Sequence, residues 1–204
     1  MTGRLFLVRH GRTPLNAEGR FRGHRDVPLD EQGLADAERA ARQLAGVGLA
    51  AVIASPLLRT RQTAEAIAAA TGAPIEIEPD LIDLDHGRWE ALTPEEAAEL
   101  DPEAFRRFRE DPRSAEAPGG ERLADVERRV LAALRRIGER FDGAACAAVS
   151  HEIPIRLAIA RLAGVDGAAV WELLVPTGAV VELRYEAGGL ALARPELVLG
   201  GPAG

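Results

Sequence analysis

The first third of the chain alternates short apolar runs with longer stretches in which apolar residues recur at helical spacing. The runs are bounded by glycine, proline or charged residues, as buried strands are, and they cover residues 4–8, 50–54 and 75–77. Between them, residues 30–44 carry an apolar face that includes Leu34, and Ser55 before Pro56 predicts the start of a helix over 56–70. This βαβαβ order predicts a largely parallel sheet with right-handed crossovers.

The pattern changes over residues 93–118, which are dense in charge and proline and only weakly amphipathic. Short helices that form a lid are expected there. Three elements follow: a helix over 120–141, a buried strand over 144–149 and a helix from about Pro154 to Ala163. The alternating runs 179–185 and 190–199 flank Gly188 and Gly189, which predicts a terminal hairpin.

Composition limits the class of protein. The 204 residues are 47% hydrophobic and 28% charged, which is typical of a globular chain and excludes a disordered or collagen-like one. We therefore expect a single α/β domain over residues 1–204, built as a three-layer sandwich. Its sheet is mostly parallel, with helices on both faces and a small helical lid over 93–118.

The lengths of the apolar runs and the number of cysteines restrict the location of the protein and its redox chemistry. No apolar run approaches the roughly 18 to 20 residues that a membrane helix needs, and no secretory or lipidation signal opens the chain. A cytoplasmic protein that does not contact a membrane is therefore expected. The single cysteine, Cys146, allows no internal disulfide, and its apolar neighbours predict a buried side chain.

Charge is distributed unevenly along the chain. The net charge is −7, which argues against nucleic acid as a partner, but residues 1–25 contain six arginines and one acid, Glu18. A basic mouth on an acidic body is expected. The 25 basic residues are all arginine, so no lysine is present to form a Schiff base or to bind phosphate in a P-loop.

Polar residues follow three of the predicted strands, at the sheet edge where open α/β sheets bind ligands. Arg9 and His10 follow the first strand, Arg59 lies in the helix after the second, and His151 follows the fourth. Two imidazoles and two guanidiniums near helix N-termini form a compact cationic pocket, which fits a tetrahedral dianion such as phosphate. A divalent metal held by His10, His151 and Asp83 is the alternative, but the two arginines would repel a cation.

Several blocks of sequence occur in a fixed order between residues 4 and 160. They are Leu7-Val8-Arg9-His10-Gly11-Arg12-Thr13-Pro14-Leu15-Asn16, Gly23 with Asp26-Val27-Pro28-Leu29, Ser55-Pro56-Leu57-Leu58-Arg59-Thr60 with Gln62-Thr63-Ala64, Pro118-Gly119-Gly120-Glu121, and Val149-Ser150-His151. Together these blocks resemble the histidine phosphatase superfamily, in its phosphoglycerate-mutase-like branch. The resemblance is very specific for the family and far less so for the substrate.

The resemblance implies a role for each residue of the pocket. His10 would attack phosphorus and become a phosphohistidine, for which its attacking nitrogen must be unprotonated. Arg9, Arg59 and His151 would surround the phosphoryl oxygens, and Asn16 would donate one further hydrogen bond. Because the arginines supply the positive charge, neither a metal nor another cofactor is expected.

The proton donor departs from the family pattern. A glutamate usually lies four residues before a glycine in this region, and here that position, before Gly87, is Asp83. The second departure is Glu152, where a small glycine commonly follows the second histidine, and the acid-phosphatase branch places an acidic donor there. Aspartate is about one methylene shorter than glutamate, but its spacing favours Asp83 over Glu152 as the acid that protonates the leaving group.

Three residues near the mouth are candidates for substrate specificity. Arg12 and Arg22 replace residues that are often acidic or neutral in the family, and each is either a contact for a second anionic group or a solvated arginine. His24 lies beside the mouth, and for it, as for His86, a packing role is the alternative. Glu90 is expected to be structural.

The first interpretation is a phosphomonoester hydrolase that acts on a small soluble phosphorylated metabolite through a phosphohistidine. A cofactor-dependent phosphoglycerate mutase is the alternative, because the lid carries four arginines, Arg106, Arg107, Arg109 and Arg113. The shortness of the lid favours the hydrolase. A non-catalytic phosphate-ligand binder is an alternative of another class. The sequence does not determine the oligomeric state, so a homodimer remains open.

Overall fold

The computed structural model describes residues 3–186 and 189–194. Its centre is one six-stranded mixed sheet with the strand order β3-β2-β4-β1-β5-β6. In chain order the strands are β1 (Gly3–Arg9), β2 (Leu49–Ala54), β3 (Ile75–Ile77), β4 (Ala145–Ser150), β5 (Val180–Glu186) and β6 (Gly189–Leu192). The last two form the predicted terminal hairpin, and the expected continuation over 195–199 lies outside the described residues.

The strand pairings decide where the strand ends meet. β1 and β2 both pair in parallel with β4, and β2 pairs in parallel with β3, while β5 runs antiparallel to β1 and to β6. Because β4 lies between β1 and β2, the carboxyl ends of all three lie side by side. Arg9 is opposite Ser150 in the β1–β4 register, so His10 and His151 leave the sheet next to each other.

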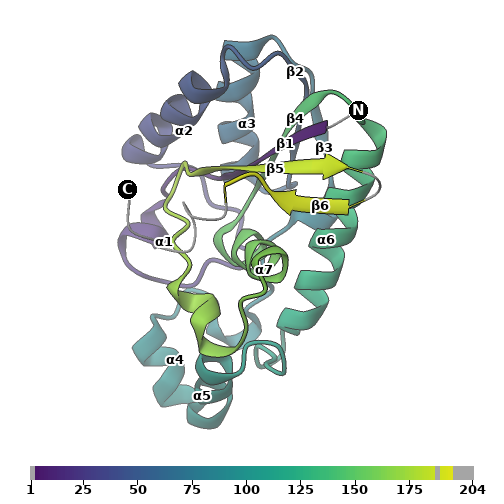
Figure 1. Ribbon diagram of the computed structural model, residues 1–204. Coiled ribbons are helices and arrows are strands. Elements are labelled where there is room, and N and C mark those ends of the chain that lie inside the picture. The colour runs from purple at the N-terminus through teal and green to yellow at the C-terminus, as the bar shows by residue number, and fades with distance from the viewer. Residues whose placement is uncertain (1–2, 187–188, 195–204) are drawn as a thin grey trace, which may run out of the picture.

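Helices cover both faces of the sheet (Figure 1). The α-helices are α1 (Pro14–Ala17), α2 (Glu31–Leu44), α3 (Leu58–Thr71), α4 (Pro94–Leu100), α5 (Pro102–Glu110), α6 (Leu123–Arg140) and α7 (Glu152–Ala163), and short 3₁₀ turns occur at η1 (Pro79–Leu81), η2 (Gly87–Trp89) and η3 (Gly167–Glu172). α2 and α3 pack on one face and α6 and α7 on the other, which is the predicted three-layer arrangement. In the part of the chain that the structure describes, no helix is both long and apolar enough to cross a membrane.

Alternate residues of the strands contribute to two separate apolar cores. Leu5 and Leu7 of β1 belong to the core beneath α6 and α7, whereas Phe6 and Val8 belong to the core beneath α2 and α3. Cys146 of β4 is buried in the first of these cores, as predicted. Burial raises the pKa of its thiol to about 12, so the side chain stays protonated and acts as a small apolar residue.

α3 and α7, the helices next to the sheet edge, begin at residues that the sequence did not predict. α3 begins at Leu58 rather than at residue 56, because Asp26, from a distant loop, accepts a hydrogen bond from the Leu58 amide at 2.5 Å and replaces Ser55 as the cap. α7 begins two residues earlier than expected, at Glu152, with His151 as its N-cap residue. The first shift leaves the Ser55 side chain, and the second the His151 side chain, available for other contacts at the sheet edge.

α2 buries three of the four positions of the apolar face that the spacing predicts, Ala37, Ala41 and Leu44, but not Leu34. Leu34 is 50% exposed, and most of the buried residues are small: Gly33, Asp36, Ala37, Ala40, Ala41 and Leu44. The reason is a close backbone approach, since a Cβ atom on Gly11 would lie 2.1 Å from the Gly33 carbonyl oxygen. Glycine is required at both positions, and the N-terminal turn of α2 therefore packs against the loop that carries His10.

The segment expected to form short helices folds into α4 and α5, which lie beyond one end of the sheet (Figure 1). Aromatic rings attach it to the rest of the molecule. Phe108 stacks on Trp171 with 4.7 Å between ring centroids and meets Trp89 edge-on at 5.5 Å. Trp171 Nε1 also donates to the Phe108 carbonyl oxygen at 3.0 Å. The chain then turns back into α6, which begins at Leu123 rather than at residue 120.

Candidate active site

The loops after β1 and β4 and the first turn of α3 bring together residues that the sequence predicts to bind phosphate. His10, Arg59 and His151 are fully buried, and the two imidazole rings lie 5.2 Å apart between centroids. Asp83, which is 2% exposed, reaches the same place from the segment between η1 and η2. We call these four residues the inner site.

His10 is held as a neutral imidazole with one nitrogen available. Its Nδ1 lies 2.6 Å from the carbonyl oxygen of Gly11, so we assign the hydrogen to Nδ1, which donates it. Burial, and then the charges of Arg59 and Arg9, lower the pKa of His10 well below its ordinary value. Nε2 is buried and has no hydrogen-bond partner among the residues described. A nucleophile toward phosphorus requires such a lone pair.

Arg59 connects the other members of the inner site. Its Nε donates to His151 Nδ1 at 3.2 Å, and its Nη2 donates to Asp83 Oδ2 at 3.1 Å. The guanidinium is also fixed to the preceding loop, where Nη2 donates to the Gly23 carbonyl oxygen at 2.9 Å and Nη1 to that of Arg25 at 2.8 Å. Burial lowers the pKa of Arg59, and the charge of Asp83 opposes that shift. Its plane is therefore oriented before any substrate binds.

His151 is oriented by two partners. Because a guanidinium can only donate, His151 Nδ1 accepts from Arg59, and Nε2 donates its hydrogen to Ser55 Oγ at 2.8 Å. Burial, and then the charge of Arg59, lower the pKa of His151 well below its ordinary value, so this imidazole is neutral as well. Sequence reasoning assigned Ser55 to a helix cap and missed its contact with His151. The only signal for this contact was its place at the end of β2.

Asp83 directs one oxygen toward the imidazoles. Its Oδ2 accepts from Arg59 and lies 3.8 Å from His151 Nδ1, and its Oδ1 accepts from the Leu84 amide at 2.9 Å. The carboxyl group thus lies beside the residues that the sequence predicts to bind phosphate.

Glu152 lies outside the inner site, in salt bridges with three arginines. Its carboxylate is 2.6 Å from Arg9 Nη2, 2.9 Å from Arg156 Nη2 and 3.5 Å from Arg22 Nη2. Burial alone would raise the pKa of Glu152, but the charges of these arginines lower it below its ordinary value. An ionised carboxylate with both oxygens in salt bridges is a poor proton donor, which weighs against Glu152 as the acid.

Arg9 connects the two groups of residues. Its Nη1 donates to the Val175 carbonyl oxygen at 2.5 Å, its Nη2 pairs with Glu152, and its Nε is buried with no partner in the described ranges. Burial lowers the pKa of Arg9 to about 10, which leaves the guanidinium charged at neutral pH. Its Nε is available to a phosphoryl oxygen.

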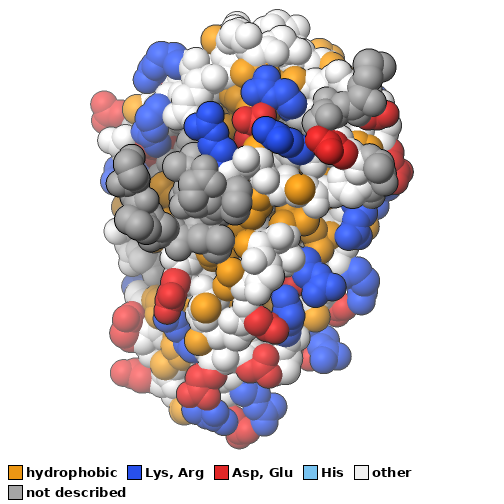
Figure 2. Space-filling view, in the orientation of Figure 1, with side chains coloured by type: hydrophobic (Ala, Val, Ile, Leu, Met, Phe, Trp, Pro, Cys, Tyr) orange, Lys and Arg blue, Asp and Glu red, His pale blue; other side chains and the backbone are white. Residues whose placement is uncertain are grey.

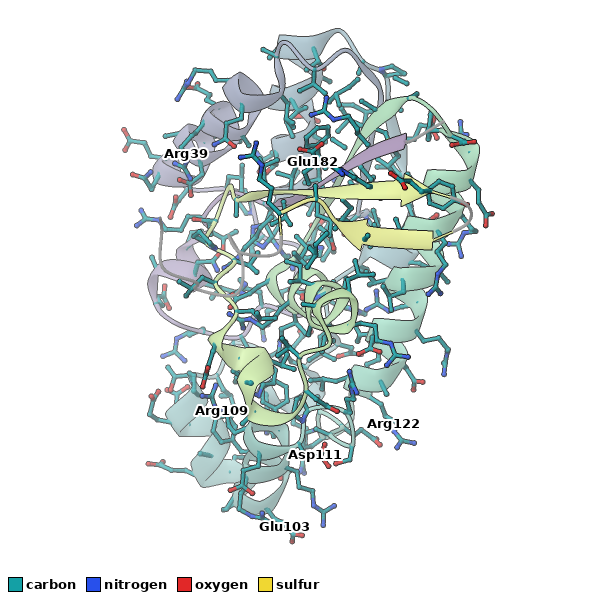
Figure 3. All side chains as sticks on the ribbon, viewed as in Figure 1. Arg39, Glu103, Arg109, Asp111, Arg122 and Glu182 are labelled. Atoms are coloured by element: carbon teal, nitrogen blue, oxygen red, sulfur yellow. The ribbon has the colours of Figure 1, made fainter. Side chains whose placement is uncertain are left out.

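A cavity of about 300 Å³, here called the outer cavity, lies beside the inner site. One wall is polar and contains Arg9, Asn16, Arg22, Glu152 and Arg156, and the other is aromatic and contains Phe21, Phe108 and Trp171. Asn16 Oδ1 accepts from the Thr13 amide at 3.0 Å, so its Nδ2 is the atom directed to a ligand. Arg109 of α5 also lines the cavity and lies 5.8 Å from the Trp171 ring, beside η3 in Figure 3.

Three residues were expected to set specificity. Of these, Arg22 is the one among the described residues that line the outer cavity. Arg12 turns away from it, with Nε 2.9 Å from Asp30 Oδ2 and 42% of its side chain exposed. His24 contacts the backbone of the inner site, since its Nε2 lies 3.1 Å from the Asp83 carbonyl oxygen. The two arginines that look alike in the sequence therefore face different surroundings.

His86 lies buried on the wall of the outer cavity and stacks on Phe21 with 4.5 Å between ring centroids. Burial lowers the pKa of His86 to about 4, so the ring is neutral. Glu90, expected to be structural, accepts from the His24 amide at 2.7 Å.

Positive charge around the inner site and the outer cavity comes from arginine side chains. Within residues 3–186 and 189–194, no group of three or more His, Cys, Asp or Glu side chains is arranged to hold a metal ion.

Comparison with known proteins gives a match over nearly the whole chain. Residues 5–197 match the family model described as "Histidine phosphatase superfamily (branch 1)". "Phosphoserine phosphatase 1" from Hydrogenobacter thermophilus is 38% identical over 168 residues, which are 82% of this chain and 80% of that protein. Among solved structures, "Bacillus stearothermophilus YhfR" has a TM-score of 0.88 and 31% identity, with 98% of each chain covered.

Another relative is much longer than this chain. "Bifunctional protein Rv2228c" from Mycobacterium tuberculosis is 36% identical over 192 residues, which are 94% of this chain. The same residues are 52% of that protein, so the chain spans about half the length of this relative.

Proposed function

This chain belongs to the histidine phosphatase superfamily and is a phosphatase, and we propose that it hydrolyses small phosphomonoesters by forming a phosphohistidine on His10. The observation that carries the proposal is the state of His10. Its imidazole is buried and neutral, and its unpartnered Nε2 lies in a site that also holds Arg59 and His151. A neutral nitrogen nucleophile beside fixed cationic and hydrogen-bonding groups is what attack on a phosphate ester needs.

The reaction takes two steps. In the first, His10 Nε2 bonds to phosphorus while the bond from phosphorus to the ester oxygen breaks, and the departing oxygen takes a proton from Asp83. Arg9 and Arg59 donate to the phosphoryl oxygens, and so does His151, through the Nε2–H that it donates to Ser55 Oγ when no substrate is bound. In the second step Asp83 takes a proton from water, the oxygen of that water attacks phosphorus, and inorganic phosphate and free His10 result.

The outer cavity supplies the space for the leaving group. Its polar wall sets Arg9, Arg22 and Arg156 against the single carboxylate of Glu152, so the wall is net positive. A net positive wall favours a leaving group with an anionic substituent, such as a carboxylate or a second phosphate. Phosphoserine, which the name of the H. thermophilus relative mentions, is one compound of this class and is the first to test.

A phosphoglycerate mutase is the second candidate, and the lid argues against it. A mutase must keep water from the phosphohistidine, for which a strongly basic cover over the site is suited. Three of the four lid arginines, Arg106, Arg107 and Arg113, pair with nearby acids, and Arg109 lines the outer cavity. Figure 2 shows acidic and basic side chains interspersed over the α4–α5 end of the molecule. Conversion of 3-phosphoglycerate to 2-phosphoglycerate without release of phosphate would establish the mutase instead.

A protein that binds phosphate ligands without turnover is the remaining alternative, and a single measurement of phosphate release separates it from an enzyme. The cytoplasmic location, the independence of a metal and the single domain over residues 1–204 with its lid remain predictions from the sequence. Assays in EDTA test the second of these directly.

The experiment combines turnover with chemical trapping. Phosphate release is measured from a panel of phosphomonoesters in EDTA, and brief reaction with labelled substrate is followed by an alkaline quench. Wild-type protein is expected to carry acid-labile phosphate on His10, and His10→Ala is expected to lose the label and essentially all turnover. Arg12→Gln, at a side chain directed away from the outer cavity, is the control and should retain both. Turnover without label on His10 would contradict the proposed nucleophile.

A further inference from the structure

The segment that carries Asp83 runs from η1 toward η2 and is held largely by side chains. Each backbone carbonyl of residues 80–83 accepts a side-chain hydrogen bond. Ser150 Oγ donates to the second of these carbonyls at 2.7 Å, and His24 also contacts the fourth. Arg129 donates to the first, third and fourth. The place of the Asp83 carboxyl therefore depends largely on one guanidinium.

Arg129, on α6, uses all five of its N–H groups at this place. Its Nη1 donates to the carbonyl oxygens of Asp80 and Ile82 at 2.7 Å each, and its Nη2 donates to that of Asp83 at 2.8 Å. The other donors bind Glu121, from Nε to Oε1 at 2.8 Å and from Nη2 to Oε2 at 2.9 Å. A lysine cannot reproduce this pattern, because its three donors radiate from one nitrogen.

Glu121 also holds the other end of the same segment. Its amide donates to the Asp85 carbonyl oxygen at 3.0 Å, two residues after Asp83. Gly120 lies so close to this oxygen that a Cβ atom on it would be only 2.3 Å away. Arg129 and Glu121 thus fix the backbone on both sides of the proposed proton donor.

We propose that Arg129 and Glu121 are positioning residues for proton transfer by Asp83, in addition to any part they have in folding. The proposal rests on the proposed function, in which Asp83 protonates the departing ester oxygen and later takes a proton from water. Because the Asp83 side chain is short, its reach toward that oxygen depends on where the backbone is held. A displacement of about 1 Å is enough to lower the rate of such a step by roughly 10²-fold.

The test is Arg129→Lys, with Arg136→Gln as a matched control. Arg136 lies on the same helix and contacts the same segment, but through the side chain of Asp80 at 2.7 Å, with 50% of its own side chain exposed. Both variants are assayed on an alkyl phosphate and on p-nitrophenyl phosphate, since an alkoxide must be protonated as it leaves and p-nitrophenolate leaves largely unaided.

The ratio of the two rates is the decisive measurement. Both rates are measured as phosphohistidine formation in a single turnover, because the later attack of water uses Asp83 whichever group has left. Arg129→Lys is expected to lose roughly 10²-fold in this rate on the alkyl phosphate and less than about fivefold on p-nitrophenyl phosphate. Arg136→Gln should leave both rates unchanged. Equal losses of Arg129→Lys on both substrates, or no loss on either, would overturn the proposal, because a general disturbance of the fold does not depend on the leaving group.

Thermal unfolding of each variant shows whether the ratio is measured on folded protein. If Arg129→Lys does not fold, Glu121→Gln replaces it, with a smaller change in the same direction expected. If neither variant folds, the pair is purely structural and the proposal fails. A wild-type protein that neither hydrolyses p-nitrophenyl phosphate nor labels His10 would refute the proposed function instead, so the two failures are distinguishable.

Discussion

The inner site and the outer cavity are built from the same two kinds of side chain, carboxylate and guanidinium, in different proportions. In the inner site, Arg59 is the one arginine among the described residues that pairs with Asp83, whose Oδ2 lies near a neutral imidazole. In the outer cavity, Glu152 is held by three arginines. A carboxylate that exchanges protons is suited to few cationic partners, whereas one that organises arginines is suited to many. The number of partners, rather than the residue type, distinguishes the two roles.

The largest expected effect on the reaction rate comes from replacing one arginine by lysine in each region. Arg59→Lys should lower kcat by roughly 10²- to 10³-fold, because an ammonium cannot contact His151, Asp83 and a phosphoryl oxygen together. Arg22→Lys should raise KM and change kcat by less than about tenfold, since Arg22 lines the outer cavity proposed for the leaving group and not the inner site. Steady-state kinetics on p-nitrophenyl phosphate and phosphoserine measure both. Similar losses in kcat would show that the two regions do not divide chemistry from binding.

A second test removes each carboxylate without changing its shape. Asp83→Asn should lower hydrolysis of an alkyl phosphate by roughly 10²-fold and affect phosphohistidine formation from p-nitrophenyl phosphate far less, because only the alkoxide needs the proton. Glu152→Gln should lower both rates by a similar factor of less than about ten. Asp83→Glu is expected to retain or raise activity by restoring the usual reach. Leaving-group sensitivity that followed Glu152 would place the acid outside the inner site.

The smallest expected effect concerns His86 and the stability of the outer cavity. The pKa of His86 falls from an ordinary value of 6.5 to about 4 on burial, so the unfolded chain binds the proton first as the pH falls. Its contribution to stability is therefore present above pH 6.5, is lost toward pH 4 and is reduced by roughly 2 kcal/mol at pH 5.

Urea unfolding at pH 8 and at pH 5 measures this difference. His86→Gln should lose less stability between the two pH values than wild-type protein does. It should not lose the whole dependence, because burial also lowers the pKa of His10 and His151. An unchanged pH dependence in His86→Gln would mean that the ring is not buried as a neutral group.

Much of the fold and of the inner site follows from local sequence. The strands over residues 4–8, 50–54 and 144–149 are apolar enough to predict a buried sheet, and the parallel pairing of their counterparts brings His10, Arg59 and His151 to one edge. The insertion of β4 between β1 and β2 and the antiparallel pairing of β5 with β1 are not visible in the order of the elements. Periodicity reports burial, and the carboxyl ends of neighbouring parallel strands lie together whatever their order.

What the sequence could not predict depends on partners that are distant along the chain. Arg12 and Arg22 both look like candidates for a second anion, but Arg12 pairs with Asp30, so only Arg22 lines the outer cavity. Ser55 looks like a helix cap until Asp26 takes that role. The contacts of Arg129 with three carbonyls have no local signature in the sequence. The pattern of an amphipathic helix does not distinguish an exposed arginine from a buried one.

The contacts of Arg9 have a consequence for the time at which the enzyme becomes active during synthesis. Its guanidinium donates to the Val175 carbonyl oxygen, 166 residues further along the chain, and the Gly178 amide donates to the carbonyl oxygen of Arg9. A nascent chain that has left the ribosome only as far as residue 174 therefore contains His10, Arg59 and Glu152 but lacks Val175 and Gly178, two of the partners that hold Arg9. Because chains emerge from their N-terminus, we expect activity to arise late, when the strand that follows Gly178 joins β1. A partly synthesised chain is then expected to hold an incomplete site.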